Sequence, residues 1–166
     1  MSFFSESTFK LFYIEFFGGI RIYIFSKCGS MELAEDLTQE AFIRLWNHRD
    51  TVEISKAKSF VFTVVNNLFL DHVRHQKVKS TYVNAFIARH DNHDPLFIME
   101  MEEFKVKLEK TIHSMPEASR VVFLMSRMEK MTYAQIADSL DLSVKAIEKR
   151  MQKALEVMSL LTAKKI

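Results

Sequence analysis

Glycine and proline are scarce in this sequence, whose 166 residues include three Gly and two Pro. The closely spaced turns of a β-sandwich or β-barrel need these residues in larger numbers. The composition is nevertheless that of a globular protein, with 48% hydrophobic and 27% charged residues, which suits one compact domain or two small ones. The sequence therefore predicts an all-α protein built from long helices with few interruptions.

Cysteine content and apolar runs indicate where such a protein works. The single cysteine, Cys28, excludes an intramolecular disulfide and any site with several thiolate ligands, and it is typical of a reducing compartment. The richest apolar stretches, 11–25 and 60–70, are broken by charged residues, glycines or asparagines, so neither is the run of about 20 apolar residues that a membrane helix needs. No secretory signal precedes them. We expect a cytoplasmic protein.

Charge and aromatic content divide the chain into parts. Counting Lys and Arg against Asp and Glu, residues 1–90 hold 11 against 9, residues 91–104 hold none against 5, and residues 105–166 hold 12 against 7. Sixteen aromatic residues lie in residues 1–90, so this part needs a large core of its own. We expect two small helical domains, 1–77 and 105–166, joined by a linker over 78–104. The basic C-terminal part favours nucleic-acid binding, although an ordinary solvated surface explains it equally well.

Apolar residues that recur every three or four positions predict the individual helices. The predicted ranges are about 7–27, 30–48, 55–77, 96–112, 116–128, 133–140 and 144–161, with a frayed helical segment near 83–88. Gly18 and Gly19 are a place where the first helix can kink. Thr132 and Ser143 directly precede the last two apolar runs, where N-caps belong.

Residues 132–158 carry the strongest local pattern, two helices joined by a three-residue turn. Ala137 is small enough to let the helices approach closely. Apolar side chains are expected to fill the joint: Ile136, Leu140, Leu142, Ile147 and Met151. The turn position that is often Gly in such motifs is Asp141, and Asp tolerates the left-handed conformation better than most residues. The pattern therefore predicts a helix-turn-helix.

The second helix of this motif carries a cationic stripe. Lys145, Lys149 and Lys153 follow one another at intervals of four, with Arg150 beside them and Ser143 at the start of the helix. A helix of this kind fits the major groove, where Lys and Arg contact phosphates or guanine. We predict DNA binding, and a plain helical hairpin with a solvated stripe is the alternative. Glu148 can either repel phosphate or accept a hydrogen bond from cytosine N4, and both interpretations stay open.

Two helices of the N-terminal part combine an apolar stripe with a distinctive polar face. In DLTQEAFIRLW (36–46), Asp36, Gln39, Glu40 and Arg44 alternate with apolar residues. In the helix over 59–77 the expected inward residues are Phe60, Val64, Leu68 and Val73. Its expected outward residues are Thr63, Asn66, Asn67, Asp71, Arg74 and Lys77, among the accessible aromatics Phe62 and Phe69. Amides, aromatics and cations suit single-stranded bases; for each helix taken alone, an ordinary polar face is the alternative.

Together these segments resemble the extracytoplasmic-function (ECF) group of the bacterial sigma-70 family over nearly the whole chain. AEDLTQEAFIRLW (34–46) looks like region 2.2 of that family. NNLFLDHVRHQ (66–76) looks like regions 2.3–2.4, with the N-L-x-x-D-x-x-R spacing kept at Asn67, Leu68, Asp71 and Arg74. Residues 115–155 look like region 4. The sequence departs from the pattern at Phe60, where the family often has Trp, and at Asp141 and Ala146, where Gly and Thr are common.

The resemblance implies a promoter-specificity subunit with no catalytic residues, cofactor, metal or small-molecule substrate of its own. Its partners would be core RNA polymerase, through the β′ clamp helices and the β subunit, promoter DNA, and an anti-sigma factor. Asp36, Gln39 and Glu40 would dock on the β′ clamp helices. The −10 element would be opened and read by Thr63, Asn66, Asn67, Arg74 and Lys77, and the −35 element by Ser143, Lys145, Lys149, Arg150 and Lys153.

Two other functions stay open from the residues alone. A helix-turn-helix regulator with a helical sensor domain would bind DNA but would not need a polymerase-binding surface on 34–46. A helical protein-interaction module would use its aromatic grooves for partner helices and would not bind DNA. An enzyme fits least well, because the six histidines form no firm metal-binding pattern with acids or thiols.

Overall fold

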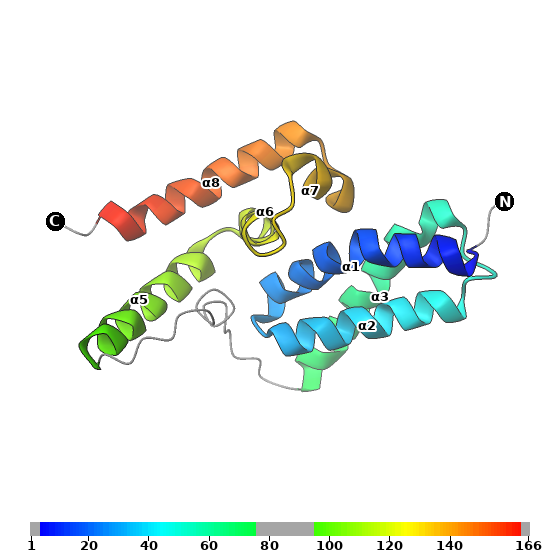
Figure 1. Cartoon of the computed structure of the whole chain (residues 1–166), viewed down its shortest axis with the longest axis horizontal. Coiled ribbons are helices and arrows are strands. Elements are labelled where there is room, and N and C mark those ends of the chain that lie inside the picture. The colour runs from blue at the N-terminus through cyan, green and yellow to red at the C-terminus, as the bar shows by residue number, and fades with distance from the viewer. Residues whose placement is uncertain (1–3, 76–94, 164–166) are drawn as a thin grey trace. The chain divides into compact units, whose positions relative to one another are not determined.

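The structure is a computed structural model that describes residues 4–75 and 95–163 (Figure 1). These ranges form α-helices and contain no strand, which confirms the all-α fold class. Two compact units divide the chain, Met1–Ser80 and Thr81–Ile166. The first unit holds α1 (Glu6–Cys28), α2 (Met31–Asn47) and α3 (Ile54–His75). The second holds α5 (Pro95–Ser114), α6 (Glu117–Met128), α7 (Tyr133–Leu140) and α8 (Val144–Ala163).

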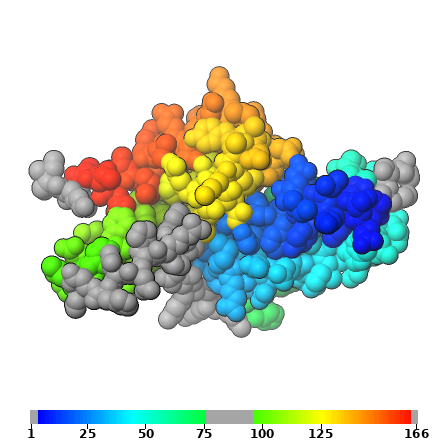
Figure 2. Space-filling model, viewed as in Figure 1, coloured from blue at the N-terminus to red at the C-terminus, as the bar shows by residue number. Residues whose placement is uncertain are grey.

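Local capping signals set the ends of the first two helices. Ser5 is the N-cap of α1, where its side chain accepts a hydrogen bond from the Thr8 amide. The helix continues without interruption through Gly18 and Gly19 and stops at Gly29, which has φ 68° and so takes the left-handed conformation that glycine adopts at little cost. Ser30 follows at once as the N-cap of α2. This two-residue connection turns the chain back, so that α1 and α2 pack side by side (Figure 2).

An aromatic cluster occupies the contact between α1 and α2. Phe42 of α2 is 2% exposed, and four rings of α1 surround it. The distances from its ring centroid are 6.4 Å to Phe9, 5.9 Å to Phe12, 5.0 Å to Tyr13 and 5.7 Å to Phe17. Such pairs add about 0.5–1.5 kcal/mol each beyond the area that they bury. The N-terminal unit thus has the large aromatic core that its composition predicts.

The buried face of α3 differs from the expected one. Ala57, Val61 and Val65 are fully buried and repeat every four residues, whereas Val73 is 46% exposed. The prediction that Val73 packs inward is therefore wrong. The reason is the helical period: twelve residues at 3.6 per turn leave Val73 about 120° around the helix from Val61. Phe60, Val64 and Leu68, also expected inward, flank the seam and are half-buried.

In the C-terminal unit, α8 contacts α5, α6 and α7. Its buried residues include Ile147, Met151 and Ala154. Helix α5 begins at Pro95, a favourable first residue because the missing N–H has no partner there anyway. Residues 95–104, which the expected linker includes, are therefore helical, as the periodicity from 96 predicts. The rest of that linker, with the frayed segment near 83–88, lies outside the described residues.

The described ranges contain neither a membrane-spanning helix nor a metal-binding cluster. No helix there is both long and apolar enough to cross a membrane. No group of three or more His, Cys, Asp or Glu side chains within 4–75 and 95–163 is placed to hold a metal ion.

Cys28 is 3% exposed, and its Sγ donates to the Ser30 carbonyl at 3.2 Å. Burial raises the pKa of the Cys28 thiol, so this residue is a small buried side chain rather than an activated nucleophile.

Candidate functional site

The first part of the candidate site is the start of α7, where Thr132 and Gln135 form a capping box. The Thr132 hydroxyl accepts a hydrogen bond from the Gln135 amide at 3.2 Å, and Gln135 Oε1 accepts one from the Thr132 amide at 2.9 Å. Two N–H groups at this helix end are thereby satisfied. The N-cap predicted at Thr132 is confirmed.

The turn between α7 and α8 depends on Asp141. This residue has φ 54° and ψ 45°, the left-handed conformation, and the next amide, that of Leu142, donates to the Ala137 carbonyl at 2.9 Å. The Ser143 hydroxyl then accepts from the Ala146 amide at 3.1 Å and caps α8. Both the left-handed Asp141 and the Ser143 cap are confirmed. The resulting motif is a helix-turn-helix with a joint closed by buried apolar side chains, among them Ile136 and Ile147.

The outward face of α8 presents the predicted cations. Lys145, Lys149 and Lys153 are all exposed and lie one above another along the helix. Arg150 is half-buried and follows Lys149 by about 100° around the helix, so it sits to the side of the stripe. Ser143 is exposed, but its hydroxyl already caps the helix. This face can contact phosphates through three lysines, with Arg150 reaching in from one edge.

A second candidate surface is the polar face of α2. Asp36 and Gln39 are exposed, and Gln39 Nε2 donates to Glu35 at 3.5 Å. Glu40 is half-buried, and its carboxylate accepts a hydrogen bond from Arg44 Nε at 2.9 Å. The expected side chains therefore share one face, but Glu40 already has a partner within the helix.

A groove between α1 and α2 adjoins this polar face and was missed by reasoning from the sequence. It has a volume of about 620 Å³. Its lining residues are Glu6, Phe9, Lys10, Tyr13, Gln39, Phe42, Ile43 and Trp46. Ile43 is 54% exposed and lies three, four and seven residues after Glu40, Gln39 and Asp36, so all four share one helix face. An isoleucine in the middle of a polar face was the signal that could have revealed the groove.

The third candidate surface lies on α3. Thr63, Asn67 and Arg74 are exposed, and Arg74 pairs with Asp71 at 3.4 Å. Asn66 is different: its Oδ1 accepts from the Tyr23 hydroxyl of α1 at 3.3 Å, and its Nδ2 donates to the Phe62 carbonyl at 2.9 Å. The structure therefore brings three of the predicted residues to the surface and ties the fourth to α1. Lys77 lies outside the described residues.

The order of these surfaces along the chain agrees with comparisons to known proteins. Residues 19–78 match the family model of sigma-70 region 2, and residues 105–158 match that of sigma-70 region 4. The chain belongs to the sigma-70 family. Region 2 spans the end of α1 with α2 and α3, and region 4 runs from within α5 to the end of the helix-turn-helix segment 132–158 in α8.

Individual relatives place this sigma factor in the ECF group. It is 24% identical to the ferric citrate uptake sigma factor FecI of Escherichia coli over 90% of this chain and 87% of FecI. It is 26% identical to the ECF RNA polymerase sigma factor SigM of Bacillus subtilis over 73% of this chain and 74% of SigM. The fold is similar to that of the sigma factor RpoE of Bartonella quintana, which was crystallised with the anti-sigma factor NepR. The two structures superpose with a TM-score of 0.51 at 19% sequence identity, and the match covers 95% of this chain and 98% of RpoE.

Proposed function

We propose that this chain directs core RNA polymerase to specific promoters as an ECF sigma factor, with the polymerase supplying all the chemistry. The observation that carries the proposal is the presence of both region 2 and region 4 in one chain. A helix-turn-helix regulator needs the second of these but has no use for the first. The working compartment is then the cytoplasm, where the polymerase acts.

In this proposal the chain works as two domains, 1–77 and 105–166, joined by the linker 78–104. In this proposal α2 binds core polymerase through Asp36 and Gln39, with Glu40 at the edge of the contact surface. The supporting observation is that the first two are exposed on a face that also carries Ile43 beside an apolar groove. A surface of this kind combines an apolar anchor with polar contacts around it, as specific interfaces do. The β′ clamp helices are the proposed partner, and the β subunit would contact the C-terminal domain.

Opening of the −10 element belongs to α3, through Thr63, Asn67, Arg74 and Lys77. Amide and hydroxyl groups can hydrogen-bond to unpaired bases, and base–aromatic stacking is typically worth about 1–3 kcal/mol per base. Asn66 contributes by a different route, because its hydrogen bond from Tyr23 ties α3 to α1 and thereby positions the exposed residues around it. Permanganate footprinting of an Asn67→Ala, Arg74→Ala variant that still binds core should show impaired strand opening.

Reading of the −35 element belongs to α8, with Ser143, Lys145, Lys149, Arg150 and Lys153 as the contacting residues. The exposed lysine stripe supports this assignment, since one helix in the major groove can place such side chains against phosphates and base edges. An anti-sigma factor is a further proposed partner. The similar RpoE structure, which contains the anti-sigma factor NepR, supports that part of the proposal.

Reconstitution with core polymerase tests the proposal. The purified chain, mixed with core enzyme of its own species, should co-elute with it and should start transcription at discrete sites on genomic DNA fragments. A helix-turn-helix regulator would bind some of these fragments without co-eluting, and an interaction module would do neither. Absence of co-elution with an active core preparation would overturn the sigma assignment.

A further inference from the structure

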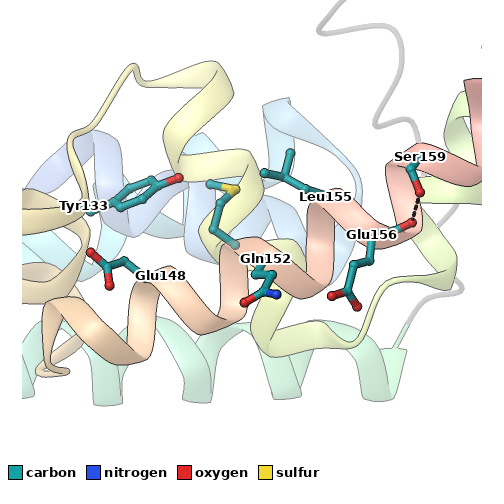
Figure 3. Close-up of a pocket in the computed structure, with 7 residues that line it drawn as sticks. Tyr133, Glu148, Gln152, Leu155, Glu156 and Ser159 are labelled. Carbon is teal, nitrogen blue, oxygen red and sulfur yellow. Dashed lines mark hydrogen bonds between the residues drawn. The ribbon is translucent and has the colours of Figure 1, made fainter.

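Two grooves on the described surface differ in how their aromatic rings are held. The groove on α8 has a volume of about 500 Å³ and one aromatic residue in its lining, Tyr133, which makes no ring contact within the described residues (Figure 3). The groove between α1 and α2 is lined by four aromatic residues, each of which contacts another of the four: Phe9, Tyr13, Phe42 and Trp46. The walls of this second groove are therefore fixed before a partner binds.

Arg49 holds one of these rings, the indole of Trp46. The guanidinium carbon of Arg49 lies 4.4 Å from the centroid of the indole, and its Nη1 donates to the Trp46 carbonyl at 2.9 Å. A planar guanidinium can stack on an aromatic ring and donate hydrogen bonds at the same time, which the ammonium group of Lys cannot do. Arg49 is not among the residues that line the groove, so it contacts the indole from a different side.

The turn after α2 fixes the backbone from which the Arg49 side chain extends. The Arg49 amide donates to the Trp46 carbonyl at 3.2 Å, and the amide and hydroxyl of Thr51 donate to the His48 carbonyl at 2.9 and 3.0 Å. The Phe9 ring of α1 meets the indole edge to face, with 4.9 Å between the centroids. The indole is thus held both by α1 and by the turn that follows its own helix.

Trp46 lies on the same face of α2 as the proposed core contacts. It follows Gln39 by seven residues and Ile43 by three, a spacing that places side chains one above another on a helix, and all three line the groove. The indole is half-buried, so part of it is available to a partner. Trp is enriched among the residues that contribute most to interfaces, and a side chain already held in its bound conformation loses less entropy on binding.

We propose that Trp46 is a further contact with core polymerase and that Arg49 is its positioning residue. The inference rests on the proposed docking of α2 on core polymerase, and it adds two residues to those named for that docking. Arg49 acts through the indole rather than by touching the polymerase. Without the stacked guanidinium, the indole would have to be ordered when the partner binds, and affinity would fall.

Arg49→Lys tests this in the full chain, because it keeps the positive charge and removes the planar group. Trp46 is the single tryptophan of the sequence, so acrylamide quenching of tryptophan fluorescence in the free chain reports on this indole alone. Quenching should increase in the variant. Affinity for core polymerase, measured by anisotropy of the labelled chain, should fall about 2- to 5-fold, which corresponds to about 0.5–1 kcal/mol for an exposed cation–π contact. The control, Arg127→Lys, makes the same change 5.8 Å from the Phe123 ring and should alter neither measurement.

A second variant tests whether Arg49 acts through Trp46. Trp46→Leu should bind core polymerase more weakly, and adding Arg49→Lys to it should cause no further loss. Equal loss in both backgrounds would overturn the proposal, because Arg49 would then contact the polymerase directly or act through the turn alone.

Two results from Arg49→Lys by itself would also overturn the proposal, so the test holds even if Trp46→Leu does not fold. One is unchanged quenching, which would mean that Arg49 does not hold the indole. The other is increased quenching with unchanged core affinity, which would mean that the position of the indole does not matter for docking. Absence of core binding by the wild-type chain would be a different result, the failure of the sigma assignment itself.

Discussion

The apolar anchor on the polar face of α2 yields a quantitative prediction. Ile43 is 54% exposed, so a partner docked on this face would bury about half of the side chain. Complete burial of an isoleucine is worth about 1.5–3 kcal/mol, and the exposed share therefore corresponds to about 0.8–1.6 kcal/mol. Replacing Ile43 with Ala should weaken core polymerase binding by about 4- to 15-fold. The fold should survive, because exposed substitutions usually change stability by less than about 0.5 kcal/mol.

Ile14 provides a matched control for this experiment. It is 67% exposed on α1 and is not among the residues that line the groove. Ile14→Ala removes the same atoms from another exposed site, so its affinity for core should stay within about twofold of wild type. Both variants can be titrated against core polymerase by fluorescence anisotropy of the labelled full chain, with thermal unfolding measured in parallel.

Three results would contradict the predicted role of Ile43. If Ile43→Ala and Ile14→Ala weaken binding equally, the groove has no special part in core docking. If Ile43→Ala binds within twofold of wild type while Gln39→Ala with Glu40→Ala still weakens binding, the polar residues dock without an apolar anchor. A large fall in the melting temperature of Ile43→Ala would contradict the exposure on which the estimate depends.

Three further predictions concern the rest of the chain. Thr132→Ala should lower the protection of the α7 amides by about 1 kcal/mol in hydrogen exchange, whereas Thr162→Ala, which removes no cap, should not. Lys153→Ala should reduce the log–log salt slope of binding between the free chain and −35 duplexes by about one unit, for all sequences alike. Lys149→Ala should instead cost about 1–3 kcal/mol of binding free energy on the preferred sequence alone. Equal behaviour of the two variants would contradict the division into phosphate and base contacts. Cys28 should react with iodoacetamide more slowly in the native than in the urea-unfolded chain at pH 8, since burial raises the pKa of its thiol and lowers the thiolate fraction.

Features set by neighbours in the chain could be predicted from the sequence. The caps at Thr132 and Ser143 and the left-handed Asp141 each depend on a few adjacent residues, and the structure has all three. The helix limits follow for the same reason, since α7 has the predicted bounds and the ends of the other helices differ from the predicted ones by at most two residues. The all-α class followed from the scarcity of Gly and Pro, because that property limits every turn at once.

Features set by tertiary contacts were harder to predict. The apolar pattern of α3 offers several stripes, and only the packing of α1 and α2 selects Ala57, Val61 and Val65 over Val73. The same holds for Asn66, whose partner Tyr23 is 43 residues away in the sequence. A polar residue on a surface helix looks the same in the sequence whether it faces solvent or another helix.

This difference bears on how the −10 surface should be tested. Removing Asn66 would break the link between α1 and α3 as well as any contact with a base, so its loss of function would not separate the two roles. Tyr23→Phe removes only the hydroxyl and leaves the Asn66 amide in place. A net hydrogen-bond contribution of about 0.5–1.5 kcal/mol would then appear as a loss of stability. If strand opening falls by more than that loss of folded protein explains, the orientation of α3 on α1 is itself part of promoter opening, and Asn66 acts by positioning its exposed neighbours.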